Sequence, residues 1–409
     1  MFINPLSAIQ ARSNYRWVML ALCALTPLCV VTLPSMSMPP LFAAISQDLG
    51  LSLVEIGVIW GTGSFAGIFF ALIGGTFGDR FGARTTLLVA CLLTGVFGLT
   101  RSFAVDFATL VITALSLGVF QAIIPVMVFT VARQWFPSEQ LGMASGVISA
   151  GFAGGLMLGP LLSTSVILPA LGGWRQVLVF FGCIAILIGL AWLVVHPVEA
   201  KSGPGRRPPV SLRDSLRHVV RLRNVWILGI GGMAINACFV GFSGYLPTYL
   251  KTIGWADLDA DRALAAFFMT SLIVVVPVSI LSDRLRLRRS FLVFASLVLS
   301  VGVGLLSIVE GTLIVLLIAT TGFVFDAFMA ILTASVLEVE GVGHRYAGTA
   351  VGFATMFRNL GGSISPPAGN SLTVIGYSVP FLFWGGVGVL GVLMFAFLLR
   401  PKAELSWES

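Results

Sequence analysis

Charged side chains are scarce in this sequence. Only 10% of the 409 residues are Asp, Glu, Lys or Arg, and 57% are hydrophobic, whereas soluble domains carry roughly 25% charged residues. This composition excludes a soluble globular protein and predicts a chain that crosses a membrane several times. We attribute the net charge of +7 to basic residues in the loops, not to an acidic partner such as nucleic acid.

Residues that hold metals or form disulfides are also few. The five cysteines lie in apolar segments without metal-ligand spacing, and the three histidines fall at helix ends or in loops. The sequence has no Gly-x4-Gly-Lys-Ser/Thr loop, and no soluble stretch is long enough for a nucleotide-hydrolysing domain. We therefore expect no metal site, no cofactor, no ATP-driven pump and no enzyme.

Long apolar runs, in contrast, fill the chain. A spanning helix needs about 20 apolar residues, and the sequence predicts twelve, so the expected fold class is an all-α polytopic membrane protein. The first run follows Arg12 and Arg16 and is too long for a signal peptide, which predicts an uncleaved first helix. The predicted spans are residues 17–40, 52–76, 85–103, 106–134, 140–166, 175–196, 224–250, 262–282, 289–309, 311–337, 346–371 and 376–399.

The basic residues set the predicted orientation. With the N-terminus in the cytoplasm, most Lys and Arg residues face inward, and only Arg101, Arg175, Lys251 and Arg262 face outward. An even number of spans then places both termini in the cytoplasm. We expect the protein in the cell membrane, the inner membrane where there are two.

One segment, 197–223, is rich in proline and basic residues. We predict that it is a cytoplasmic linker whose later part forms a surface helix. It would join an N-terminal six-helix bundle (1–196) to a C-terminal six-helix bundle (224–409), and we expect the chain to work as a monomer.

The two halves of the sequence resemble each other, which is typical of a duplicated transporter. The second and eighth spans both end in Asp-Arg, and the fifth and eleventh share glycines and a proline at identical spacing. Such small residues let helices approach closely. The matched residues are Asp79-Arg80 with Asp283-Arg284, and Gly146, Gly155 and Pro160 with Gly352, Gly361 and Pro366.

Two of these segments resemble motifs of the major facilitator superfamily. Gly75-Thr-Phe-Gly-Asp79-Arg80-Phe-Gly82-Ala-Arg84 is similar to its loop between spans 2 and 3, and Gly146-x8-Gly155-x3-Gly159-Pro160 is similar to the span 5 motif of its antiporters. The resemblance implies two pseudo-symmetric six-helix bundles around a cavity lined by spans 1, 4, 7 and 10, which rock to open it to each side in turn.

The resemblance also implies a gate at the cytoplasmic ends of the helices, with Arg133 as a partner for Asp79. The alternative is that these charges merely anchor loops. The predicted gate residues are Asp79, Arg80, Arg84, Arg133, Asp283 and Arg284.

Two charged residues lie deep inside apolar spans. Asp326 is roughly 16 Å and Arg358 roughly 18 Å from the inner ends of their spans at 1.5 Å per residue, so both lie near the midplane. Because their spans are consecutive and antiparallel, we predict that the two side chains can form a salt bridge. In the functional interpretation, Arg358 binds an anionic group of the cargo and Asp326 modulates that site or takes a proton. The alternative is a purely structural ion pair.

Other polar and aromatic residues of the spans complete the predicted substrate site. Each could equally bond or pack between helices. They are Thr26, Thr32, Gln121, Asn236, Trp60, Tyr245 and Asn359.

The leading hypothesis is therefore a secondary transporter of a small organic or inorganic anion, coupled to protons. A single central arginine favours a monocarboxylate, because a polyanion would need more than one cation. One alternative is proton-coupled export of a drug-like compound or cation held by Asp326. The other is a membrane receptor or sensor that binds a ligand without transporting it.

Overall fold

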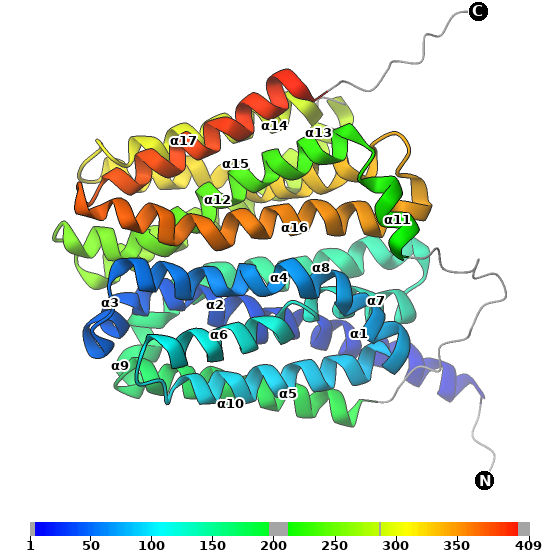
Figure 1. Cartoon of the computed structure of the whole chain (residues 1–409). Coiled ribbons are helices and arrows are strands. Elements are labelled where there is room, and N and C mark those ends of the chain that lie inside the picture. Colours follow the sequence, from blue (N-terminus) through cyan, green and yellow to red (C-terminus); the bar gives the residue numbers. More distant parts are fainter. Residues whose placement is uncertain (1–4, 196–211, 286–287, 400–409) are drawn as a thin grey trace, which may run out of the picture. The chain divides into compact units, whose positions relative to one another are not determined.

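The structure is a computed structural model that describes residues 5–195, 212–285 and 288–399, and these residues form helices and no strands (Figure 1). The first part of the chain contains α1 (Pro5–Thr26), the π-helix η1 (Pro27–Thr32), α2 (Leu33–Met36), α3 (Met38–Leu49), α4 (Leu53–Phe81), α5 (Ala83–Arg101), α6 (Phe107–Gln121), α7 (Ile124–Trp135), α8 (Ser138–Leu162), the π-helix η2 (Ser163–Ile167), α9 (Leu168–Leu171) and α10 (Trp174–Val194).

The second part continues the same all-helical pattern. It contains α11 (Leu212–Val219), α12 (Arg223–Thr252), α13 (Asp257–Leu285), α14 (Arg288–Leu305), α15 (Leu313–Leu337), α16 (Gly343–Asn370), the 3-10 helix η3 (Ser371–Val374), α17 (Val379–Leu393) and the π-helix η4 (Met394–Leu398).

Each predicted span coincides with one or more of these helices. Ten helical segments among the described residues are long and apolar enough to cross a membrane. The remaining long helices, α13 and α16, stand at the predicted spans 262–282 and 346–371. The middle of α16 carries Arg358 and Asn359, which lowers its apolar character.

The chain divides into two compact units. Unit 1 comprises Met1–Leu49 and Phe70–Pro204, and unit 2 comprises Gly50–Phe69 and Gly205–Ser409. The first part of α4 therefore packs with the second half of the chain. The boundaries 1–196, 197–223 and 224–409 stay predictions. The helix expected late in the linker is α11, whereas residues 196–211 lie outside the described part of the chain.

The first predicted span is not one straight helix. It consists of α1, η1, α2 and α3, with Ser37 between the last two. Pro27 has no N–H to donate and begins the wider π-helical turn. Within this turn Thr32 Oγ1 donates to the carbonyl of Pro27 (3.2 Å), and Gln121 Nε2 of α6 donates to the carbonyl of Val30 (2.8 Å). Side chains thus satisfy carbonyl groups in the distorted part of the helix.

Glycines of α8 and α16 allow a neighbouring helix to approach closely. A Cβ atom at Gly155 would lie 2.8 Å from the backbone nitrogen of Leu33, and one at Gly361 would lie 2.9 Å from Cγ of Met233 on α12. No real Cβ atom tolerates such distances without a shift of its neighbours. The repeated glycine spacing therefore marks equivalent packing positions in the two halves.

The helix α12 is the centre of unit 2. It is buried over most of its length and packs against α13, α16 and α17. The rings of Phe239 on α12 and Phe325 on α15 stack with centroids 4.0 Å apart, which places α15 firmly beside α12. Three further phenylalanines join this aromatic cluster, namely Phe242, Phe267 and Phe268.

Candidate functional site

The guanidinium of Arg358 is the central feature of the candidate site in unit 2. Arg358 lies in the middle of α16, and its side chain is half-buried. Its Nη1 lies 3.7 Å from Sδ of Met329 on α15. A thioether sulfur is a weak hydrogen-bond acceptor. The N–H fork of Arg358 therefore stays open to a stronger acceptor, such as a carboxylate.

The salt bridge predicted between Asp326 and Arg358 is not formed among the described residues, and this prediction is wrong. The backbone N–H of Asp326 donates to Ser271 Oγ of α13 at 3.0 Å, so this turn of α15 lies against α13. Met329, three residues later, reaches Arg358 instead. The position of a residue along its helix predicts how deep it lies in the membrane. It does not predict which way the side chain points, because each residue turns that direction by about 100°.

Asn236 and Asn359 lie beside the turn of α16 that carries the arginine. Asn236 Nδ2 donates to the backbone carbonyl of Arg358 at 2.9 Å. The amide has room because a Cβ at Gly362 would lie only 2.8 Å from it. The amide of Asn359 lies against Gly67 of α4. Asn236 thus fixes the backbone from which the guanidinium extends, and its binding of a ligand stays a prediction.

Trp60 and Tyr245 use their polar atoms to join segments of unit 2. Trp60 Nε1 donates to the carbonyl of Val240 at 2.8 Å, and its ring lies against Gly244 of α12. The Tyr245 hydroxyl donates to the carbonyl of Tyr377 at 3.0 Å. Both residues hold α12 in place, and their predicted contact with substrate is untested.

The three candidates of unit 1 also bond to backbone carbonyls. Thr26 Oγ1 donates to Leu22 O at 2.7 Å and accepts a bond from Trp192 Nε1 at 3.0 Å. Thr32 and Gln121 donate to carbonyls of η1, as described above. The structure places them at helix contacts, and their role in substrate binding stays a prediction.

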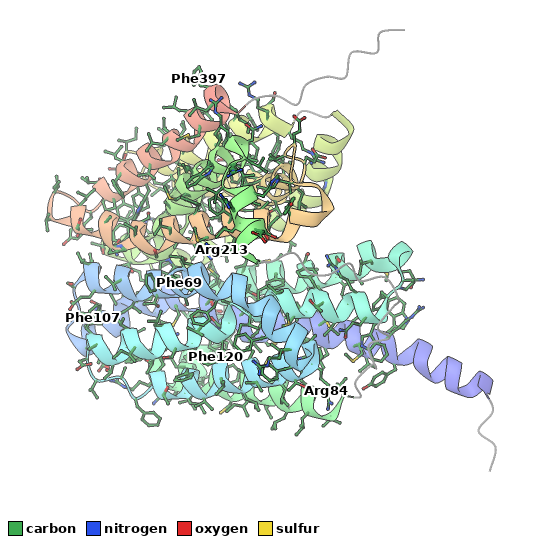
Figure 2. The ribbon with its side chains drawn as sticks, turned by 45° about the vertical axis from the view of Figure 1, so that its right-hand side comes forward. Phe69, Arg84, Phe107, Phe120, Arg213 and Phe397 are labelled. Carbon is green, nitrogen blue, oxygen red and sulfur yellow. The ribbon has the colours of Figure 1, made fainter. Side chains whose placement is uncertain are left out.

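Among the predicted gate residues, Arg84 has the most defined position. Its Nε donates to the carbonyl of Trp192 at 3.0 Å, and its Nη2 donates to that of Leu193. Figure 2 shows Arg84 beside the end of α10. The last carbonyls of a helix lack partners within the helix and attract cations. Arg84 therefore caps the C-terminal end of α10.

The other gate residues have fewer described contacts. Arg80 is exposed, and its guanidinium lies 5.4 Å from the centroid of the Phe81 ring. Arg133 is exposed in the last turn of α7. The side chains of Asp79, Asp283 and Arg284 lie outside the described part of the structure, so the pairing of Asp79 with Arg133 stays a prediction.

Sequence analysis missed the side chains that adjoin the two central charges, Met329 and Ser271. Met329 follows Asp326 by three residues, a spacing that turns its side chain by about 60° around the helix from that of Asp326. No comparable signal pointed to Ser271, because nothing in the sequence shows that α13 packs against α15.

The chain matches a known family model and curated proteins along most of its length. Residues 23–366 and 260–409 match the model described as Major Facilitator Superfamily. A probable sulfoacetate transporter of Cupriavidus necator is 24% identical over 383 residues, which cover 85% of this chain and 86% of that protein. A hexuronate transporter of Bacillus subtilis is 25% identical over 390 residues, which cover 87% and 88%.

The fold has a close counterpart among solved structures. A crystal structure of the nucleoside transporter NupG superimposes with a TM-score of 0.80 and covers 94% of this chain and 99% of its own. The two sequences are only 12% identical, so this likeness supports the fold alone. It confirms the predicted all-α fold of two pseudo-symmetric helix bundles.

Proposed function

Because the chain belongs to the major facilitator superfamily, we propose that it moves a small anion across the membrane as a secondary transporter. Membership makes the protein a multi-pass membrane transporter and not an enzyme, as the sequence predicted. The observation that carries the anion proposal is the guanidinium of Arg358, which contacts a thioether and no acid among the described residues. A carboxylate can accept two parallel hydrogen bonds from such a group.

The relatives support an anionic cargo. Sulfoacetate and hexuronate, the compounds in the names of two relatives, both contain a carboxylate. A single arginine matches a single negative charge better than several, so a monocarboxylate is the best candidate. Arg358 is then the anchor of the carboxylate, and Asn236 holds the turn of α16 that carries it.

Asp326 is the candidate for coupling transport to protons. It forms no ion pair among the described residues, so its charge is not neutralised by Arg358. Proton coupling requires a group that binds and releases a proton, and a carboxyl group can do so. We include in the proposal alternating access, a location in the cell (inner) membrane with both termini in the cytoplasm, and action as a monomer.

Counterflow in proteoliposomes tests the anion proposal. Vesicles loaded with one unlabelled monocarboxylate from a panel should take up its labelled form through the wild-type protein. Arg358→Gln should lower the rate about 10- to 100-fold, because a hydrogen bond to a charged group contributes about 1.5–3 kcal/mol. Arg358→Lys should retain part of it. Wild-type rates in Arg358→Gln would refute the proposed role of this residue.

A matched control shows whether a slower rate comes from the loss of Arg358 itself or from the loss of any one positive charge. Arg262 is exposed and lies 3.5 Å from Asp259 on the same helix. Arg262→Gln removes one positive charge without changing the candidate site, and it should transport at the wild-type rate. The thermal unfolding of both variants shows whether either one merely misfolds.

Export of a cation is the second candidate, and the missing ion pair favours it, since Asp326 is free to hold a positive charge. In that case Asp326→Asn abolishes export while Arg358→Gln has a milder effect. A receptor or sensor is recognised by ligand binding without counterflow. Under the anion proposal, Asp326→Asn should leave counterflow intact and abolish acceleration by a proton gradient.

A further inference from the structure

A small cavity inside unit 1 contains a buried arginine. The cavity has a volume of about 30 Å³ and is lined by residues of η1, α2, α5, α6 and α10. Its walls are mainly apolar. Its polar members are Ser35, Thr94, Arg101 and Gln121.

Arg101 lines this cavity, and no acidic side chain among the described residues pairs with its charge. The residue is only 8% exposed. Its Nη2 lies 2.9 Å from Sδ of Met38, and its Nε has no hydrogen-bond partner. No ion pair among the described residues involves Arg101. Of the acids near this end of unit 1, Asp48 pairs with Arg175, and Asp106 caps α6 by accepting hydrogen bonds from Thr109. A guanidinium keeps its charge at physiological pH, so something else must compensate it.

Thr94 adds to the same cavity a second polar group that lacks a hydrogen-bond partner. It is 3% exposed, and its Oγ1 has no partner. Gln121, in contrast, already donates its Nε2 to the Val30 carbonyl. Buried polar groups in proteins nearly always have a hydrogen-bond partner. The cavity therefore offers the unpartnered N–H of Arg101 and O–H of Thr94 beside the hydroxyl of Ser35, and its lining contains no acidic side chain.

The volume of the cavity limits which molecule or ion can accept hydrogen bonds from these donors. On this measure about 10–15 Å³ is enough for one water molecule, so about 30 Å³ also admits a monatomic anion. A water molecule would satisfy the hydrogen bonds but leave the positive charge of Arg101 uncompensated in an apolar surrounding, which is unfavourable.

We propose that Arg101 and Thr94 hold a monovalent inorganic anion of about the size of chloride inside unit 1. The anion accepts hydrogen bonds from Nε of Arg101 and Oγ1 of Thr94, and it neutralises the guanidinium. Arg101 also reaches Met38 of α3. The bound anion therefore stabilises the packing of α5 against the segments that follow α1.

The dependence of thermal unfolding on the anion tests this proposal. The full-length protein is compared in chloride, bromide and gluconate at equal ionic strength, because gluconate is too large for the cavity. Chloride and bromide should raise the unfolding temperature by about 2 °C at about five times their Kd. The rise should saturate with concentration.

Four variants show where the anion binds. Arg101→Leu should unfold at the same temperature in all three salts, and Thr94→Val should raise the half-saturating chloride concentration about tenfold. Arg175→Gln alters an exposed arginine near the same end of unit 1 and should keep the full response. Arg358→Gln should keep it as well, which separates this site from the proposed transport site.

Two results would overturn the proposal. One is an equal unfolding temperature of the wild-type protein in chloride and gluconate. The other is an equal chloride response in Arg101→Leu, which would reveal a general salt effect. Crystals grown in bromide decide the matter even if the variants fail to fold, because the bound ion gives an anomalous peak beside Arg101. A cavity that holds only water gives none.

Discussion

The helix pair α5–α10 in unit 1 and the pair α14–α17 in unit 2 have the same arginine contact at one end and different residues at the other. Arg84 donates to the carbonyls of Trp192 and Leu193 at the end of α10. In unit 2, Arg289 donates to the carbonyls of Phe395 and Ala396 in η4, which follows α17. At the other end, 17 residues after each of these arginines, unit 1 has Arg101 and unit 2 has Leu306. Leu306 is 1% exposed. The arginine cap therefore belongs to the duplicated scaffold, whereas Arg101 is particular to unit 1.

The two helix pairs also share a close crossing near their middle. In both, glycines allow close crossing: a Cβ at Gly182 would lie 3.0 Å from the Gly95 carbonyl, and one at Gly385 would lie 2.8 Å from the Ser300 carbonyl. The duplicated part of the structure thus includes the crossing and one capped end. A residue that departs from this shared pattern is a candidate for function, because packing alone does not require it.

The largest effect should follow from giving unit 2 the arginine of unit 1. Leu306→Arg buries a charge without an acid or a polar cavity and should destabilise the protein by about 3–5 kcal/mol. The reverse change, Arg101→Leu, should be well tolerated. Thermal unfolding of both variants checks this, and equal losses would show that Arg101 is required by packing.

Removal of either arginine cap should have the next largest effect. Arg84→Ala and Arg289→Ala each leave helix-end carbonyls without donors and should cost about 2 kcal/mol. The two losses should be similar if the cap is a shared device. Unfolding in increasing denaturant measures them. A loss confined to one of the two arginines would show that the cap is not a shared device.

A methyl group at the helix crossing should have a somewhat smaller effect. Gly385→Ala places Cβ against backbone atoms of Gly304 and Ser300, which cannot rotate away. We expect a loss of about 1–2 kcal/mol. Gly182→Ala should lose less, because its closest neighbour is the flexible side chain of Leu99. Unfolding temperatures give the order, and a larger loss in Gly182→Ala would contradict it.

The smallest effect concerns the exposed ion pair of unit 1. Arg175 donates to Asp48 and holds the pKa of that carboxyl below its usual value. The stabilisation is present above the unfolded-state pKa of about 3.9 and disappears as the pH falls through the lower folded-state pKa. Asp48→Asn should therefore unfold slightly earlier at pH 7 and equal the wild type at strongly acid pH. A constant difference over this range would refute the assignment.

The sequence predicted the helices and the packing role of the repeated glycines, because apolar length and small-residue spacing depend on local composition. It could not predict which way a side chain turns. Asp326 and Arg358 lie near the middle of α15 and α16, yet the side chain that reaches the guanidinium among the described residues is Met329. Arg101 was expected among the outward-facing basic residues, and its burial depends on the position of Met38 in another helix.

The uncharged candidates show the same limit. Thr26, Gln121 and Asn236 were predicted from polarity inside apolar spans, and each proved to bond to another helix or to its backbone. Polarity inside a span shows that a group needs a partner. Only the fold shows whether that partner is a neighbouring carbonyl or remains to be supplied.

The sulfur beside Arg358 has a consequence for the speed of ligand exchange. If Arg358 anchors the cargo as proposed, an entering oxyanion displaces a weak, uncharged neighbour and breaks no ion pair, so its capture would meet a low activation barrier. On release, Met329 would cover the guanidinium again without binding it tightly. The empty transporter would then avoid a deep energy minimum that slows each cycle.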